Sequence, residues 1–466
     1  MKKIHNLLIL ALLTIGMGLT SCDEQLDNAL NPTVTSILLD ADEMELNVGD
    51  EGQLKVIVDP ADATVTWSSD KESVATVDAT GKVTAVAEGI ATITATAGDK
   101  TTVCTITVTN LLAMPLTLEA ISAGKITVTS PKDGMKVSKN GGAKTAITAN
   151  PTEINVAAGD KVAFYGTATS YAGTSIGGSG DGFKCKVYGN IMSLLYEDFA
   201  DKTELPTDIK TFTYLFWNNT TLTDASGLLL PATTLTTSCY LNMFHGCTAL
   251  TSAPKELPAT NLVNHCYQEM FFNCEALTSA PELKATDLAQ NCYFEMFFNC
   301  KALTSAPELK ATDLTGADYC YEAMFQNCTS LTTAPELPAT ELATCCYYMM
   351  FQGCTSLTTT PELPATELAK SCYNQMFYGC SNLTETPKLL ATTLADNSYK
   401  NMFQNCSSLT KAYVKAAYDA GNCADMFKGC TAAGAKLHTT SGNKGSWSSA
   451  ITSNSWTTWT ADGDWN

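Results

Sequence analysis

The chain has 466 residues, enough for about three domains. Hydrophobic residues make up 45% of it and charged residues 16%, which excludes an intrinsically disordered chain and predicts a globular one. The formal net charge of −19 disfavours nucleic acid and anionic membrane surfaces as partners, because both repel a strongly acidic protein.

The first 22 residues predict an export signal. Lysines at positions 2 and 3 precede an apolar run at 7–18, which is too short to span a bilayer. The run ends in "LTSC", which resembles the lipobox of bacterial lipoproteins. The resemblance implies cleavage before Cys22 and lipidation of that cysteine. The alternative is an ordinary secretory signal with a chance cysteine.

The residues after Cys22 bear on where the protein is displayed. Asp23, Glu24 and Asp27 lie in a short linker, residues 23–33. In some Gram-negative anaerobes, acidic residues at this place accompany export to the outer face of the outer membrane. The resemblance therefore implies a lipid-anchored outer-membrane protein, exposed on the cell surface, that contacts the membrane through its anchor only.

Residues 34–110 alternate short β-branched runs with turn signals about 8 to 12 residues apart, which predicts an all-β sandwich. Three runs resemble the bacterial Ig-like group 2 family: "LNVGD" at 46–50, "WSSDKESVATVDATGKVTAVAEGIATITA" at 67–95 and "CTITV" at 104–108. The family implies a spacer or adhesion module on a bacterial surface. The expected core contains Trp67, Val74, Val77 and Ile93.

Residues 111–200 predict a second β-sandwich-like domain, because strand-like runs such as "GKITVTS" are separated by glycine-rich turns. The segment contains a formal G-x-S-x-G at 173–177. A nucleophile elbow needs a helix after the serine, whereas Gly178, Gly180 and Gly182 follow here. Because a helix does not tolerate that many glycines, we expect a loop and no nucleophile.

A repeat of about 26 residues fills residues 201–436. The methionines that mark its copies are spaced by 24 to 28 residues, a period typical of solenoids. Leu215-Phe216 marks a degenerate first copy. The marker residues are Met243, Met270, Met296, Met324, Met350, Met376, Met402 and Met426.

Each copy predicts a helix followed by a short strand. From Thr340 to Cys354, apolar residues fall on one stripe at 100° per residue, and Thr340 suits an N-cap. The residue before the second cysteine of each copy is always Gly or Asn, which predicts a left-handed residue that ends the helix. Pro361 and its equivalents should keep the following strand pairing short.

This helix–turn–strand unit resembles the leucine-rich repeat of BspA-like bacterial surface proteins, roughly Ala-Phe-x-x-Cys-x-x-Leu-x-x-Ile. The matching run is "MFQGCTSL" at 350–357, and the departure is "TPEL" at 360–363, with a proline and one additional residue. The resemblance implies an α/β leucine-rich-repeat solenoid. We therefore expect a multidomain fold: an N-terminal all-β Ig-like sandwich, a second β-sandwich-like domain and the solenoid.

Sixteen of the nineteen cysteines lie in the repeats, in most copies as a pair eight residues apart. In a helix that spacing is about 12 Å, beyond the roughly 7 Å that a disulfide allows, so no bridge is expected within a copy. Neighbouring helices pack roughly 8–10 Å apart, so the first-position cysteines of successive copies should not bridge either. Asn219 occupies the second position in the first copy, and Ser398 replaces the first cysteine of its copy while Cys406 remains. An obligate pair would lose both cysteines together, which argues against such pairs.

The second-position cysteines are therefore expected to form a buried, reduced ladder that satisfies backbone groups, as Asn or Cys does in leucine-rich repeats. Two alternatives stay open: disulfides between strands about 4.8 Å apart, and a metal array, although zinc-type C-x₂₋₄-C knuckles and His partners are missing. The ladder residues are Cys247, Cys274, Cys300, Cys328, Cys354, Cys380, Cys406 and Cys430.

Glutamates recur in one column of the repeats, which Lys388 ends. Stacked like charges cost stability unless they are solvated or neutralised. The column is therefore either a strip on the concave face that binds a cation or a basic ligand, or the solvated edge of each strand. Its members are Glu282, Glu308, Glu336 and Glu362.

Four tryptophans cluster in residues 437–466. The last repeat leaves an apolar end that must be covered, so we expect a C-terminal cap. Exposed aromatics that stack on sugar rings are the alternative. The residues are Trp447, Trp456, Trp459 and Trp465.

No acid–base constellation, phosphate-binding loop or metal motif stands out, so we predict no catalytic residue, no cofactor, no metal and no enzyme. We expect a surface lipoprotein that acts in adhesion or recognition and binds a host or environmental protein or polysaccharide through its repeats. A glycan-binding component of a nutrient-uptake system and a structural envelope spacer are the alternatives.

Overall fold

The computed structural model describes residues 33–207, 210–454, 456 and 458–465. The expected signal peptide at 1–22, the lipidation site Cys22 and nearly all of the linker lie outside the described residues. The chain divides into two compact units, one up to Asn110 and one from Leu111 onward. No helix among the described residues has the length and hydropathy of a membrane span.

The first unit is all β. Its core packs Val74 and Ile93, which are fully buried, and half-buried Trp67 and Val77 pack against them as predicted. Burial alternates along the long strands because successive side chains point to opposite faces. The sheets are β2(Glu43–Asn47)-β9(Lys100–Thr109)-β8(Gly89–Ala97)-β5(Thr66–Ser69), β3(Glu51–Gln53)-β7(Lys82–Ala85)-β6(Ala75–Val77) and β1(Ser36–Leu39)-β4(Val56–Asp59).

The second unit begins with two sheets and a short 3₁₀ helix, η1 (Ile191–Leu194). The residues at 175–179, expected to lie in a loop, form the strand β16 (Ser175–Ser179), which pairs with β11 (Gly124–Thr129), so that expectation was wrong. The sheets are β13(Thr145–Ala146)-β12(Lys136–Lys139)-β15(Lys161–Tyr165)-β10(Thr117–Ala120)-β17(Cys185–Asn190)-β18(Leu222–Leu229) and β14(Thr152–Val156)-β11(Gly124–Thr129)-β16(Ser175–Ser179). Because β17 pairs in parallel with β18, the larger sheet continues into the first copy of the repeat.

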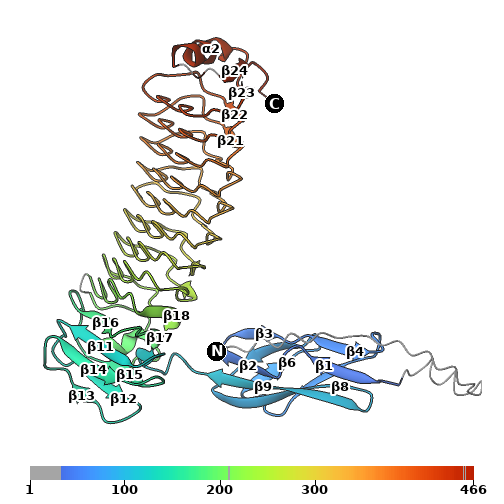
Figure 1. The fold of residues 1–466 in the computed structure, drawn as a ribbon, viewed down its shortest axis with the longest axis vertical. Helices are drawn as coiled ribbons and strands as arrows, with labels where there is room; N and C mark the ends of the chain where they lie inside the picture. The colour runs from blue at the N-terminus through green and yellow to red at the C-terminus, as the bar shows by residue number, and fades with distance from the viewer. Residues whose placement is uncertain (1–32, 208–209, 455, 457, 466) are drawn as a thin grey trace, which may run out of the picture. The chain divides into compact units, whose positions relative to one another are not determined.

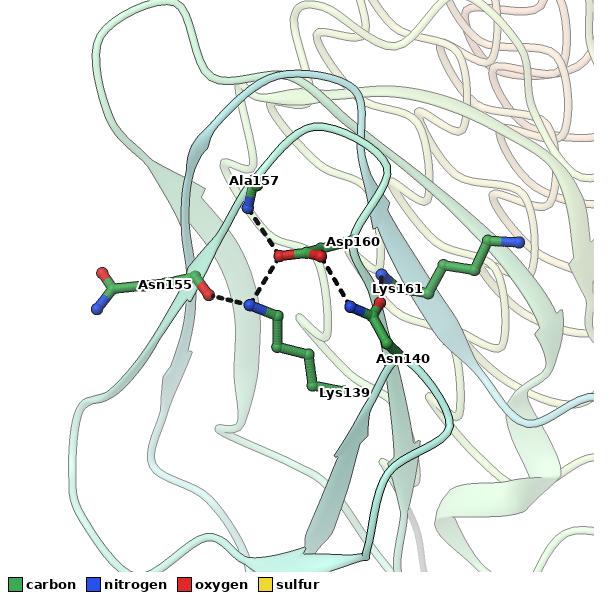
Figure 2. A network of polar contacts seen from close by, with 6 residues as sticks. All are labelled: Lys139, Asn140, Asn155, Ala157, Asp160 and Lys161. Carbon is green, nitrogen blue, oxygen red and sulfur yellow. Dashed lines mark hydrogen bonds and ion pairs between the residues drawn. The ribbon is translucent and has the colours of Figure 1, made fainter.

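A polar cluster fixes the turn between β14 and β15 (Figure 2). One carboxylate oxygen of Asp160 lies 2.7 Å from Lys139 Nζ and accepts a hydrogen bond from the Ala157 amide. The other accepts from the Asn140 side chain, and Lys139 also donates to the Asn155 carbonyl. The bonds from Lys139, Asn140 and Ala157 hold the pKa of Asp160 well below its usual range.

The described part of the repeat region contains no α-helix, so the predicted α/β leucine-rich-repeat solenoid is wrong. Where a helix was expected, Cys345, Met349 and Gly353 have φ values of 55°, 55° and 75°. One left-handed residue every four positions is incompatible with a right-handed helix. The Gly or Asn before the second cysteine is indeed left-handed in all eight copies, but it belongs to a series of tight turns and ends no helix.

Backbone hydrogen bonds show how the tight turns stack. The Met350 amide donates to the Tyr347 carbonyl three residues back. The alternate amides point to the next copy instead: Tyr347 donates to Cys372 and Phe351 to Met376. Other copies repeat this pattern. Each copy thus bonds to its neighbour as strands do, along a segment that forms no regular strand.

Aromatic rings stack along the same direction. The phenylalanines that follow the marker residues lie 5.3 to 6.1 Å apart between ring centroids, from Phe216 to Phe427. Successive copies are therefore closer together than the 8–10 Å expected for packed helices, and that expectation was wrong. A second buried column, from Tyr240 to Tyr399, has separations of 5.6 to 6.2 Å.

Strand pairing on the other side of each copy is short. It consists of β19 (Glu256–Leu257) with β20 (Glu282–Leu283) and isolated parallel bridges such as Thr333 to Thr359. A parallel sheet closes the far end of the stack (Figure 1), in the order β21(Glu385–Leu389)-β22(Lys411–Val414)-β23(Ala435–His438)-β24(Trp459–Asp462).

The last copy is covered by the C-terminal segment, which includes helix α2 (Lys444–Ser453). Trp447 is fully buried and donates its indole N–H to the Ala416 carbonyl at 2.9 Å. Trp456 and Trp459 pack on Phe427, with centroid distances of 5.7 and 4.6 Å. The apolar end of the stack is thereby removed from water.

Candidate functional site

The glutamates singled out from the sequence lie on what we call the strand face, the outward side chains of the strand segments. All four side chains are exposed. Lys284 Nζ lies 2.6 Å from Glu282 and 3.6 Å from Glu256, and Lys310 bridges Glu282 and Glu308 at 3.7 and 3.4 Å. Lysines therefore neutralise the first half of the column, which favours a solvated edge over a cation-binding strip.

The strand registers continue this column beyond Lys388 through Tyr413 and His438 to Asp462. The His438 ring stacks on Tyr413 at 4.9 Å, and its Nδ1 lies 2.8 Å from Asp464 Oδ1. Ligand atoms of His438, Asp462 and Asp464 all lie within 4.8 Å of one another. These side chains could hold a divalent cation, although His438 and Asp464 already have each other as hydrogen-bond partners.

The eight second-position cysteines form a ladder of thiols. Each is buried, and its Sγ lies 3.0 to 3.2 Å from a phenylalanine carbonyl of the preceding copy, as Cys354 does with Phe325. Burial raises the pKa of the Cys354 thiol to about 12, so the sulfur stays a protonated donor. In the first copy, Asn219 donates to the Ile176 carbonyl instead. The ladder is structural rather than reactive.

A second surface, to which the sequence analysis assigned no function, is the turn face: the outward side chains of the tight-turn segments. In the first copy Tyr214 and Trp217 are 40% and 46% exposed and contact each other edge to face at 6.1 Å. A half-buried column continues from Trp217 through His245 and Phe272 to Phe298, with centroid distances of 6.4, 4.5 and 4.5 Å. The ring contacts make these residues one contiguous aromatic patch, and contiguous exposed apolar patches, unlike single exposed residues, often mark contact sites.

Polar side chains adjoin these aromatics. His245 Nδ1 lies 3.6 Å from Glu269 Oε2, too far for a hydrogen bond but close enough for electrostatic attraction. Gln268 donates to Glu269 at 2.9 Å, and His265 Nδ1 lies 2.7 Å from Gln268 Oε1. His245 and Gln268 together keep the pKa of Glu269 below its ordinary value, against the opposing effect of burial. The network holds an ionised carboxylate beside the exposed aromatic pair.

Two further carboxyl groups on the turn face have pKa values shifted in the opposite direction, above the ordinary value. The pKa of Glu295 is raised to about 7, mainly by burial and also by the neighbouring Glu269, while His245 opposes the shift. Burial also raises the pKa of Glu322 to about 7, with Glu295 adding to it. Tyr319, Cys345 and Tyr348 also lie near Glu322. Near neutral pH these two carboxyls are therefore partly protonated.

The raised pKa values predict a pH-dependent stability. In the unfolded chain both carboxyls titrate near their ordinary value of 4.5, so between pH 4.5 and about 7 the folded state holds more protons. The free energy of unfolding should fall as the pH rises through that range. After allowance for partial solvent screening, we expect Glu295→Gln combined with Glu322→Gln to recover about 1–2 kcal/mol at pH 8.

Denaturation of the parent and the double variant at pH 5, 6, 7 and 8 checks this expectation. Glu336→Gln combined with Glu362→Gln, both exposed on the strand face, serves as the matched control and should leave the pH profile unchanged. A parent and a double variant with parallel profiles would show that these carboxyls titrate normally.

Comparison with known proteins identifies the class of the N-terminal unit. Residues 33–108 match the family described as bacterial Ig-like domain (group 2), and strands β1 to β9 occupy this segment. The resemblance noted in the sequence is thereby confirmed for these residues, and the unit is a bacterial Ig-like domain. Lipidation at Cys22 stays a prediction.

Two curated relatives are similar over short stretches. The lacto-N-biosidase of Bifidobacterium bifidum is 49% identical over 75 residues, 16% of this chain and 7% of that protein. An uncharacterised protein of Clostridium acetobutylicum is 36% identical over 118 residues, 24% of this chain and 12% of that protein. The chain thus spans a small part of the length of these relatives.

Solved structures of an S-layer protein, SbsC, resemble parts of the chain. The match to its domains 4 and 5 has 28% sequence identity and a TM-score of 0.16, and it covers 17% of this chain and 53% of the matched chain. Its domains 5 and 6 are 19% identical and cover 28% of this chain and 85% of that one, with a TM-score of 0.16. TM-scores this low support no argument about fold or function.

Proposed function

We propose that the protein is a cell-surface recognition protein that binds a macromolecular ligand through the turn face of its repeats. The exposed pair Tyr214 and Trp217 is the observation that carries this proposal. Such side chains combine a large apolar body with a polar end, and they often anchor contacts between macromolecules. The strand face, by contrast, offers solvated charges that lysines partly neutralise.

The proposed location rests on the sequence and on the Ig-like domain. The "LTSC" run supports a lipid anchor on Cys22, and the acidic residues that follow it support display on the outer face of the outer membrane. The membrane contact would be the anchor alone, with the Ig-like domain as a spacer. The net charge of −19 supports a protein or polysaccharide partner rather than nucleic acid.

The proposal can be tested with cells that express the full chain, the Cys22→Ala variant or the Trp217→Ala variant. Antibody should label intact cells with the parent and Trp217→Ala chains but not with Cys22→Ala. Adhesion to immobilised matrix proteins and polysaccharides should fall with Trp217→Ala and persist with Glu336→Gln on the strand face. Equal adhesion by all displayed variants would contradict a role for the turn face. Displayed chains that adhere to nothing would favour the alternative, an envelope spacer.

A further inference from the structure

Three side-chain oxygens on the turn face have no hydrogen-bond partner among the described residues. Glu322 Oε2, Gln352 Oε1 and Asn374 Oδ1 are each shielded from solvent and receive no hydrogen bond. They belong to three consecutive copies, those marked by Met324, Met350 and Met376. Buried acceptors without donors are rare in folded proteins because they carry an energetic cost. A ligand that supplies O–H or N–H groups to this face would relieve it.

The charges on this face narrow the class of ligand. The outward positions of the tight turns between Tyr214 and Tyr378 carry one lysine, Lys370, against several carboxylates, so an anionic polymer is disfavoured. A basic polypeptide is also poorly matched. Glu269 already faces His245 at 3.6 Å, and the raised pKa values leave Glu295 and Glu322 partly protonated near neutral pH. A neutral ligand rich in hydroxyl groups fits these constraints best.

The aromatic residues and the repetition point to the same class. A sugar ring offers C–H groups that pack on an indole or phenol ring and hydroxyl groups that both donate and accept hydrogen bonds. Amides such as those of Gln352 and Asn374 also donate and accept. Along the column from Trp217 to Phe298, the ring centroids of successive copies lie 4.5 to 6.4 Å apart. A chain of repeating units can therefore use equivalent sites together, which adds their weak affinities.

We propose that the turn face binds a neutral polysaccharide that runs along the stack of repeats. Trp217 and Tyr214 form its aromatic platform, and Glu322, Gln352 and Asn374 receive its hydroxyl groups. This inference rests on the proposed function, because it names the ligand class of the same face.

The test measures binding of the full chain to immobilised laminarin, yeast mannan and xyloglucan. Heparin, polylysine and a set of matrix proteins serve as comparisons. We expect binding to at least one of the neutral polysaccharides, with little dependence on salt. Trp217→Ala and Asn374→Ala should each weaken it by about tenfold or more, while Glu336→Gln should leave it within about twofold. Thermal unfolding of each variant, and a second exposed variant, Tyr214→Ala, separate lost contacts from lost folding.

Several outcomes would overturn the inference. One is binding only to polylysine that falls with added salt, which would identify a basic polypeptide as the ligand. Another is binding to a neutral polysaccharide that survives all three turn-face substitutions. Binding to matrix proteins alone, lost with Trp217→Ala, would reject the polysaccharide and keep the proposed function. A folded chain that binds none of the probes would remove both.

Discussion

Replacement of Phe325 with alanine should lower the free energy of unfolding of the second unit by about 3–5 kcal/mol. The ring is fully buried between Phe297 and Phe351, at centroid distances of 5.6 and 5.7 Å. The backbone cannot close the resulting cavity, because the Phe325 amide is bonded to Met350 of the next copy at 2.9 Å. Denaturant titration of the full chain, followed by circular dichroism, measures the loss.

Gln326→Ala is the matched control, since this half-buried side chain is the next residue on the same turn. It should cost about 1 kcal/mol or less. Because copies contact only their neighbours, the loss at Phe325 should appear as early opening around its own copy. Equal effects of the two substitutions would mean that the phenylalanine column is not a packed core.

Trp447→Ala should lower the free energy of unfolding by a similar amount, about 3–5 kcal/mol, but at the C-terminal end of the stack. The indole is fully buried, packs edge to face on Tyr418 at 5.2 Å and donates to the Ala416 carbonyl. Its loss exposes the apolar end of the last copy, so the stack should open from that end. Limited proteolysis followed by mass spectrometry should show new cleavage sites that begin in the C-terminal copies.

Ser448→Ala is the control for the cap, because this exposed residue lies on the same helix, α2. It should leave both the unfolding midpoint and the cleavage pattern unchanged. If Trp447→Ala left the C-terminal copies as resistant as the parent, the segment would not protect the end of the stack.

The N-terminal domain could be predicted from the sequence because alternation with a period of two has few competing interpretations. The repeats were harder. Their period and the left-handed Gly or Asn position were predicted correctly. Apolar pairs at i, i+1, i+4 and i+5, however, are compatible both with an α-helix and with a run of four-residue turns. A helix turns 100° per residue and a run of four-residue turns 90°, a difference of about 10° per residue. Over the nine residues from Cys346 to Cys354 the two patterns cannot be separated.

The missing signal was backbone conformation. Glu295, Met349 and Gln375 have φ values of 50°, 55° and 57°, although such residues rarely adopt the left-handed region. The cost of that conformation, about 1–2 kcal/mol each, is offset by the hydrogen bonds that run between copies. Because those bonds depend on the neighbouring copy, they cannot be predicted from the residue pattern of a single copy.

The same reason explains which surface the sequence analysis found. The glutamates of the strand face stand in the same place in successive copies, so alignment of the copies shows them. On the turn face the equivalent positions hold Trp217, His245, Phe272, Phe298 and Gln326. Under a helical interpretation these are unrelated residues on a solvated side. They become a continuous surface only when the copies stack at 4.5 to 6.4 Å.

The tight-turn stack underlies both candidate faces, and Asn401 tests it most directly. This residue lies in the middle of a turn segment with a φ of 56°, and its amide donates to Ala424 of the next copy at 2.9 Å. At a left-handed position glycine is favoured over alanine by about 1 kcal/mol, whereas in a helix interior alanine is favoured by about as much. Denaturant titration should therefore find Asn401→Gly more stable than Asn401→Ala. The reverse order would show that the segment is helical and would contradict the stack described here.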